Sequence, residues 1–137
     1  MGHISGSRGD ALVYEFYRMM PEGFFLLNTT GKIRQLADDH IQRQIDFIEE
    51  AAIDLEQTGA DVVIASGSPM WTLMGYGSEV ETTNRIQPKL SIPFATAIVA
   101  EMEAMRKVGI RKVVVATPHR EDMNERMARF LNAAGFE

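Results

Sequence analysis

The stretch that decides the fold is residues 61–77, which read DVVIASGSPMWTLMGYG. It opens with an uninterrupted apolar run at residues 62–65 and then breaks into small polar residues and glycines. A short β-branched run without polar alternation is typical of a strand that is covered on both faces, as in a parallel sheet. The residues that follow, 66–77, are predicted to form a loop at the carboxyl end of this strand.

The rest of the chain alternates similar strands with amphipathic helices. The clearest helix spans residues 38–57, where apolar side chains recur at intervals of three and four residues. These side chains are Ile41, Ile45, Ile48, Ala52 and Leu55. Further helices are predicted at 11–19, at 78–86, between Thr96 and Gly109, and after Thr117-Pro118, and further strands at 23–27, 92–95 and 113–116. The alternation predicts an α/β fold with a mainly parallel sheet flanked by helices.

Two alternatives remain open for the first ten residues. Residues 1–10 are either an expression tag or a truncated first strand and loop, whereas residues 11–137 are expected to form a single α/β domain.

Composition excludes several classes of protein. The chain has 137 residues, of which 45% are apolar and 24% charged, as expected for one soluble globular domain. A net charge of -5 without a basic stripe argues against a nucleic-acid partner. No apolar run approaches the roughly 18 residues that span a membrane. The lack of cysteine excludes disulfides and fits a cytoplasmic protein, and three scattered histidines do not suggest a metal site.

Two segments after predicted strands carry groups suited to chemistry. Ser66 and Ser68 offer hydroxyls, and Gly67 between them permits a positive φ that lets backbone N–H groups converge on an anion. Thr117 and His119 lie at a predicted helix start, where unpaired N–H groups favour a carboxylate or phosphate. Because ligands bind at the carboxyl ends of parallel strands, these segments predict a small-anion pocket. The glycine spacing of a dinucleotide site is absent.

Each of these features also has a simpler structural interpretation. Glycine and serine are ordinary turn residues after a buried strand. Thr117-Pro118 fits a plain helix start, with threonine as N-cap and proline at the first position, and His119 fits a surface residue. A hydrolase triad of Ser66, His119 and Asp122 is disfavoured, because no G-x-S-x-G turn is present and Asp122 is only three residues from His119.

Three segments, taken in order, resemble the maleate isomerase and arylmalonate decarboxylase branch of the aspartate/glutamate racemase superfamily. They are EFYRMMPEG at 15–23, GADVVIASGSP at 59–69 and GIRKVVVATPHREDMNERMARFLNAAGFE at 109–137, with its NER at 124–126. The resemblance covers nearly the whole chain but only the first half of the family fold. It implies one half of a pseudo-two-fold, two-domain racemase-like fold. It also implies a small carboxylate substrate, held by N–H groups and hydroxyls without metal or organic cofactor.

The chain departs from the family pattern at the residues that matter most. The resemblance aligns Ser66 with the first catalytic cysteine of the isomerases and His119 with a position where tyrosine is common. A serine hydroxyl is a far weaker acid than a thiol and a poor base unless a neighbour activates it. Residues 6–10 match a substrate loop in which Gly9 replaces the binding asparagine. The second half of the family fold, with its own cysteine, is not matched.

The resemblance therefore implies a cofactor-independent isomerase- or decarboxylase-like protein for a small (di)carboxylic acid, incomplete in this chain. Ser66 and His119 are the catalytic candidates. The candidates for substrate binding are Ser7, Gly67, Ser68 and Thr117. The alternative is a non-catalytic carboxylate-binding or dimerisation domain, in which a homodimer covers the apolar face that the second half would cover.

Overall fold

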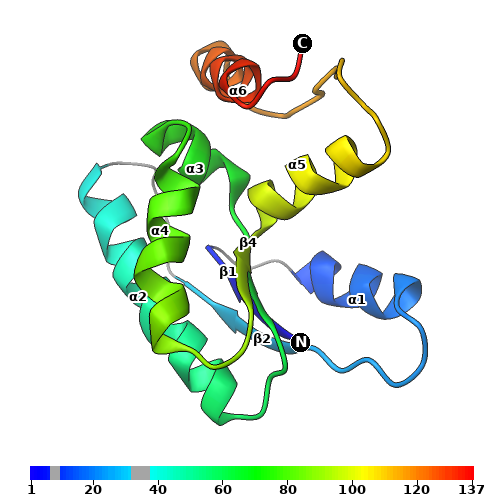
Figure 1. The fold of residues 1–137 in the computed structure, drawn as a ribbon, viewed down its shortest axis with the longest axis vertical. Coiled ribbons are helices and arrows are strands. Elements are labelled where there is room, and N and C mark those ends of the chain that lie inside the picture. Colours follow the sequence, from blue (N-terminus) through cyan, green and yellow to red (C-terminus); the bar gives the residue numbers. More distant parts are fainter. Residues whose placement is uncertain (7–9, 32–37) are drawn as a thin grey trace.

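Four parallel strands form the centre of the structure, a computed structural model that describes residues 1–6, 10–31 and 38–137 (Figure 1). The strand order is β2-β1-β3-β4. The bounds are Gly2–Ser5 for β1, Leu27–Thr30 for β2, Val63–Ala65 for β3 and Phe94–Thr96 for β4. β1 pairs in parallel with both β2 and β3, and β4 pairs in parallel with β3. The predicted α/β fold with a mainly parallel sheet is confirmed.

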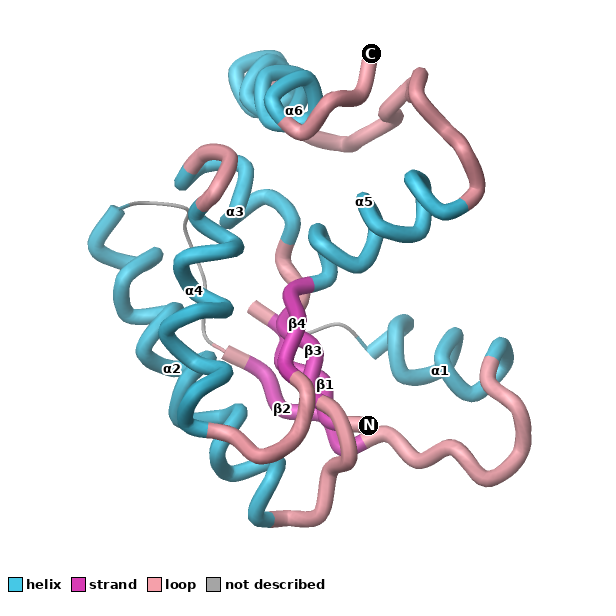
Figure 2. The backbone as a smooth tube through the Cα atoms, viewed as in Figure 1, coloured by secondary structure: helices cyan, strands magenta, loops and turns pink. Residues whose placement is uncertain are grey.

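Helices cover the sheet on both sides. Helix α1 (Asp10–Met19) lies on one side, and α2 (Asp38–Gln57) and α4 (Ser78–Ile86) lie on the other, as Figure 2 shows along the tube. The remaining helices are α3 (Ser68–Met74), the short 3-10 helix η1 (Gln87–Lys89), α5 (Ala97–Lys107) and α6 (Glu121–Ala133). Helix α6 lies farthest from the strands, next to the C-terminus.

The two faces of the sheet differ in chemistry because alternate residues of a strand point to opposite faces. The core face, which packs against α2, is mainly apolar: it carries Gly2, Ile4, Val63, Ala65 and Phe94, together with Leu27 and Thr29 of β2 and the buried Thr96 of β4. A Cβ built on Gly2 would lie 3.1 Å from Leu55 of α2, so helix and strand approach closely there. The opposite face, called here the α1 face, carries His3, Asn28, Ile64 and Ser66.

The hydrophobic core fills the space between the core face and the helices. Ile48 and Ala52 of α2, Trp71 of α3 and Ile86 of α4 are all 0% exposed. Full burial of a side chain such as Ile48 stabilises the fold by about 1.5–3 kcal/mol. The apolar stripe predicted for residues 38–57 is confirmed at Ile45, Ile48, Ala52 and Leu55. The side chain of Ile41 lies outside the described part of the chain.

The predicted helices agree closely with the structure, but the strand predicted at residues 23–27 is wrong. The strand is β2, Leu27–Thr30, and Phe24 and Phe25 before it are 54% and 68% exposed. β2 lies at an edge of the sheet and bonds only to β1. An edge strand needs backbone pairing more than apolar side chains, so the polar sequence LNTT forms it and the apolar run does not.

The strand predicted at residues 113–116 is also wrong. This segment has irregular backbone, and Val114 is fully exposed. Its pairing with the C-terminus consists of two bonds: the N–H of Val113 donates to the Glu137 carbonyl and the N–H of Glu137 donates to the Arg111 carbonyl, both at 2.8 Å. A strand requires backbone hydrogen bonds to a partner along its length, and the single residue Glu137 cannot supply them for residues 114–116.

The segment predicted as a loop, 66–77, contains helix α3. The helix has Pro69 in its first turn, where the fixed φ of proline suits a helix and its missing N–H costs nothing. Trp71, which is fully buried, then packs the helix against the core.

The structure also assigns Gly2–Ser5 to the central strand β1, while the division of the chain at residue 10 stays a prediction.

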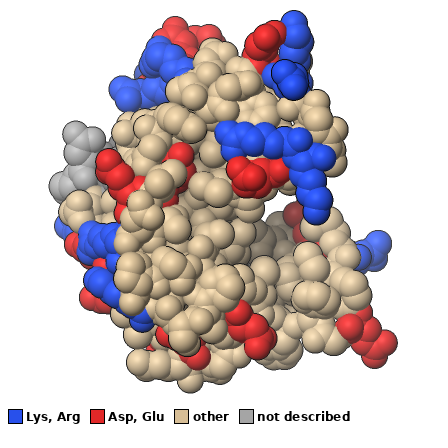
Figure 3. Space-filling model, in the orientation of Figure 1, with Lys and Arg blue, Asp and Glu red and all other residues tan. Residues whose placement is uncertain are grey.

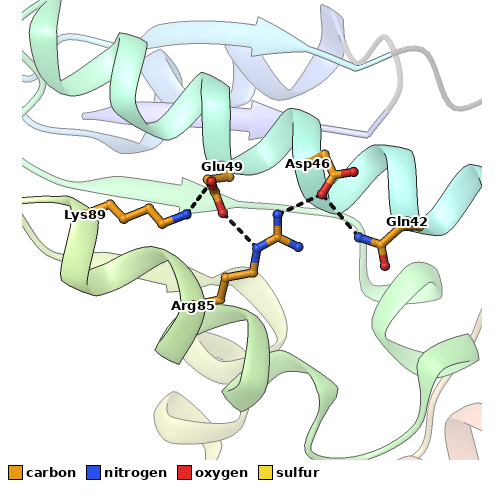
Figure 4. A network of polar contacts seen from close by, with 5 residues as sticks. All are labelled: Gln42, Asp46, Glu49, Arg85 and Lys89. Carbon is orange, nitrogen blue, oxygen red and sulfur yellow. Dashed lines mark hydrogen bonds and ion pairs between the residues drawn. The ribbon is translucent and has the colours of Figure 1, made fainter.

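A network of ion pairs and hydrogen bonds between charged side chains connects α2 to α4 and η1 (Figure 4). Arg85 donates from Nη2 to Asp46 and from Nε to Glu49, each at 2.8 Å, and Lys89 also binds Glu49. The hydrogen bond from Lys89, followed by that from Arg85, holds the pKa of Glu49 below its usual value against an opposing effect of burial. The hydrogen bond from Arg85 is the main cause of the lowered pKa of Asp46.

Candidate functional site

A chain of hydrogen bonds crosses three neighbouring strands on the α1 face. His3 of β1 lies opposite Asn28 of β2 in register, and its Nδ1 is 2.6 Å from Asn28 Oδ1. Its Nε2 is 3.0 Å from the hydroxyl of Ser66, the first residue after β3. His3 is only 3% exposed, whereas Asn28 reaches solvent at the sheet edge. We call these three residues the relay.

The relay opens onto a cavity of about 270 Å³ between the sheet and α1. Both His3 and Ser66 line it, together with apolar side chains and one carboxylate, Glu15 of α1. The apolar part of the lining includes Leu12, Phe16, Met19, Ile64 and Ala97. In the space-filling view, this face of the molecule is hollowed between α5 and α1 (Figure 3). The hydroxyl of Ser66 is therefore available to a small molecule.

Gly67 makes the turn from β3 into α3. Its φ of 126° lies in the region that favours glycine, and no atom lies within 4 Å of the position a Cβ would take. Ser68 follows, and its hydroxyl hydrogen-bonds to the carboxyl group of Glu101 on α5. Partial burial raises the pKa of Glu101, and the bond from Ser68 opposes this only in part. A carboxyl group thus stands beside the serine that was predicted to bind a carboxylate.

Thr117 and His119 lie before α6, in a local network with Asn124. The Thr117 hydroxyl is 2.6 Å from Asn124 Oδ1 and accepts a 3.1 Å hydrogen bond from the N–H of His119. The Nδ2 of Asn124 lies 3.4 Å from the His119 carbonyl. The prediction that Thr117 caps the helix and Pro118 begins it is wrong, since α6 starts at Glu121 with Arg120 as N-cap. Thr117 closes a turn with His119 instead.

The predicted site residues fall into two groups. Ser66, Gly67 and Ser68 are consecutive, and α3, which they lead into, touches α6 where the Thr72 hydroxyl meets the sulfur of Met127 at 3.4 Å. Within the described ranges 1–6, 10–31 and 38–137, no hydrogen bond joins Ser66–Ser68 to Thr117 or His119. Ser7 lies outside the described residues. The catalytic and binding roles of these residues stay predictions.

Three residues of this region were missed by sequence reasoning: His3, Asn28 and Glu101. The contact between His3 and Ser66 joins residues 63 positions apart, which no local pattern reveals. One signal was present: the alternation in Gly2-His3-Ile4 puts a histidine on the face opposite the apolar one, if the segment is a strand.

Two further features of the described residues bear on the kind of site. No group of three or more His, Asp or Glu side chains in this part of the chain could hold a metal ion. None of the helices that the structure describes is long and apolar enough to cross a membrane.

The comparison with known proteins agrees with the fold and the resemblance. The sequence profile of arylmalonate decarboxylase matches residues 11–137. The arylmalonate decarboxylase of Bordetella bronchiseptica is 26% identical over 114 residues, which are 83% of this chain and 47% of that protein. The chain thus spans about half the length of this relative.

Solved structures show the same fold, and this chain again matches little more than half of the length of each. A crystal structure of arylmalonate decarboxylase superposes with a TM-score of 0.82 at 24% identity, over 98% of this chain and 59% of the other. The maleate isomerase Iso from Pseudomonas putida S16 gives 0.82 at 20% identity, over 99% and 60%. Because the family profile covers every residue after the tenth, the chain belongs to the arylmalonate decarboxylase family.

Proposed function

We propose that this chain provides one half of a cofactor-independent active site, of isomerase or decarboxylase type, for a small (di)carboxylic acid. The observation that carries the proposal is the turn at Gly67 between two serine hydroxyls, at the carboxyl end of β3, in a chain of the arylmalonate decarboxylase family. The carboxyl ends of parallel strands are where α/β proteins bind ligands.

The proposed binding mode uses short polar groups. The hydroxyl of Ser68 and the backbone at Gly67 receive one carboxylate, and Thr117 or His119 holds a second carboxylate or stabilises an enolate. Loss of carbon dioxide, or removal of an α-proton, leaves such an enolate, so donors placed around it lower the barrier. With no cysteine in the chain, these residues serve binding and charge stabilisation rather than thiol chemistry.

Calorimetric titration with malonate, maleate and an arylmalonate tests the proposal on the 137-residue chain. Removal of a hydrogen bond to a charged group costs about 1.5–3 kcal/mol, so Ser68→Ala should weaken binding roughly 10- to 100-fold, and His119→Ala should weaken the dicarboxylates more than a monocarboxylate. The matched control is Ser91→Ala, an exposed serine bonded to Glu56 on another side of the molecule. Binding that is absent, or that ignores both substitutions, would overturn the proposal.

Glu101 adds a second, independent readout to the same titration. An ionised carboxylate beside Ser68 repels an anionic ligand and occupies the Ser68 hydroxyl. Because burial raises the pKa of Glu101, the group becomes neutral at a higher pH than an ordinary glutamate as the pH falls. Carboxylate affinity should therefore rise on mild acidification, and Glu101→Gln should reproduce this rise at neutral pH. Equal carboxylate affinity of the wild type and Glu101→Gln at neutral pH would mean that the ligand binds away from Glu101.

A second candidate function, a dimerisation domain, is favoured by one observation. Apolar side chains between α5 and α6 are exposed: Val108 is 71% exposed, Ile110 41%, Val114 101% and Val115 49%. A second copy of the chain would bury them around a two-fold axis. We expect sedimentation to show a dimer that Val114→Asp converts to monomer, whereas Val80→Asp, at an exposed valine of α4, leaves it intact. A folded monomer at all concentrations would exclude the dimer.

A further inference from the structure

We propose that Ser66 is a nucleophile activated by His3, with Asn28 holding the imidazole in the required tautomer, and that the cavity beside them accepts a small uncharged ester. The inference goes beyond carboxylate binding, because it assigns covalent acyl transfer to the relay. It uses a cavity on the α1 face that the groups proposed to hold a carboxylate do not line.

The tautomer follows from the hydrogen bonds. The oxygen Asn28 Oδ1 can only accept, so the ring nitrogen 2.6 Å away, Nδ1, must carry the proton. In the neutral ring, Nε2 is then left with a lone pair that faces the Ser66 hydroxyl at 3.0 Å. The other acceptor near this hydroxyl, the Ile4 carbonyl at 3.4 Å, is the more distant one. Ser66 thus donates its proton to His3 and presents oxygen lone pairs to the cavity.

This arrangement satisfies the geometric requirement for an activated nucleophile. A nucleophile, a base within hydrogen-bond reach of it, and a third group that orients the base together make a hydroxyl reactive. Here the three groups come from β1, β2 and the end of β3, so the hydrogen-bonded sheet fixes their separations. The strand register holds His3 opposite Asn28. His3 is 3% exposed and is bonded through both ring nitrogens, which holds the imidazole in this orientation.

The cavity indicates the class of substrate. Its lining is mainly apolar, and among the described residues that line it Glu15 is the one carboxylate. Met1 also lines the cavity, but its terminal ammonium donates a 2.8 Å hydrogen bond to the Phe25 carbonyl, so a negatively charged molecule would meet the Glu15 carboxylate beside a cation that is already bonded. A neutral ester with a short apolar acyl group fits both the volume of about 270 Å³ and the charge.

The chemical step balances with water as the co-reactant. The Ser66 oxygen attacks the ester carbonyl while its proton passes to His3 Nε2. The ester C–O bond breaks, the alcohol leaves with the proton from His3, and an acyl group remains on Ser66. Water, deprotonated by His3, then attacks the acyl carbon, and the Ser66–acyl bond breaks to release the acid and restore the serine.

The test uses a fluorophosphonate probe and p-nitrophenyl acetate with the full 137-residue chain. We expect mass spectrometry to find the phosphonyl group on Ser66 and Ser66→Ala to abolish it. His3→Gln should slow both labelling and ester hydrolysis by roughly 10²-fold or more. Asn28→Ala should slow them by at least about tenfold, whereas Asn28→Asp, which can also accept from Nδ1, should retain the rate. Ser91→Ala is the matched control and should change nothing.

Folding is measured separately, because His3 is buried in a central strand. Thermal unfolding of each variant shows whether a lost rate reflects a lost fold, and Asn28, at the exposed sheet edge, gives a variant that tolerates substitution. If Ser66 is labelled as fast in His3→Gln and Asn28→Ala as in the wild type, the proposed activation of Ser66 by the relay is wrong. Absence of labelling in the folded wild type would overturn it as well. Neither result bears on carboxylate titration at Ser68, so the two proposals fail separately.

Discussion

The two faces of the sheet are made by the same strands but differ in their side chains: one face is packed and mainly apolar, and the other carries a hydrogen-bonded polar chain. On the core face, Ile4, Val63 and Ala65 are fully buried against helices and make no polar contact through their side chains. On the α1 face, one residue away in each strand, His3 and Ser66 exchange a hydrogen bond beside a cavity. The strict alternation of a strand therefore places the packed apolar side chains and the hydrogen-bonded polar ones on opposite sides of the same backbone.

This difference predicts which substitutions should change the free energy of unfolding and which should change binding or reactivity. A change on the core face alters the free energy of unfolding through packing, because protein interiors are close-packed. A change on the α1 face is expected to alter the proposed reactivity, and at Asn28, which is exposed at the sheet edge, it should affect stability less than a change in the core does.

The largest expected effect is in the hydrophobic core, on the helix α2 that packs against the core face. Ile48 of α2 is 0% exposed, so Ile48→Ala removes buried methyl groups and leaves a cavity, at a cost of about 2–5 kcal/mol of unfolding free energy. Urea unfolding measures it. The control is Val80→Ala on α4, where the side chain is 51% exposed and the change should stay within about 0.5 kcal/mol. Equal losses at the two sites would contradict the described core.

Gly67, where the chain leaves the sheet, should show an intermediate effect. With a φ of 126° and no atom within 4 Å of a built Cβ, Gly67→Ala meets no clash and pays only backbone strain. We expect a loss of roughly 1–3 kcal/mol in the same urea experiment, together with weaker carboxylate binding, since the turn orients Ser68. Unchanged stability and binding would show that the turn does not need a positive φ.

The smallest effect is expected at the surface network on α2 and α4. Arg85→Gln should cost at most about 1 kcal/mol, the range for exposed ion pairs such as that of Arg85 with Glu49. The folded-state pKa of Glu49 is lowered, so its contribution is present above the unfolded pKa and is lost as pH falls through the folded pKa. The variant should therefore lose less stability than the wild type on acidification.

Urea midpoints at neutral and acid pH measure this difference. The control is Arg129→Gln, because Arg129 pairs with Glu125 at 3.7 Å on an exposed face of α6 and should leave the acid dependence unchanged. An acid dependence in Arg85→Gln as steep as in the wild type would mean that Arg85 contributes nothing to it, since the bond from Lys89 to Glu49 remains in this variant.

The sequence predicted helices better than strands, and the physical reason is locality. The stripe on α2 and the bounds of α4 follow from spacings within one segment, since each helix makes its own backbone bonds. Strands depend on partners elsewhere in the chain. β2 forms from a polar segment because β1 lies beside it, and the apolar run at 113–116 forms no strand because only Glu137 pairs with it.

The candidate site was predictable in part for the same reason. The turn at Gly67 and the hydroxyls around it stand out in the local sequence after an apolar strand. The partners of those hydroxyls do not, because His3 reaches Ser66 across the sheet and Glu101 reaches Ser68 from α5. A serine hydroxyl is a poor base unless a neighbour activates it, and the neighbour of Ser66 is His3, whose Nε2 lies 3.0 Å from the hydroxyl.

The short pairing of Glu137 with residues 111–113 has a consequence for behaviour at high concentration. Beyond Val113, residues 114–116 have irregular backbone, and the side chains of Val114 and Val115 are exposed. A short apolar, β-branched run that is exposed favours association with the same segment of another molecule. Arg111 and Lys112, both exposed, immediately precede this apolar run, and charges in that position oppose the approach of an identical segment, although the charge of Lys112 is partly offset by its ion pair with Glu137 at 2.9 Å.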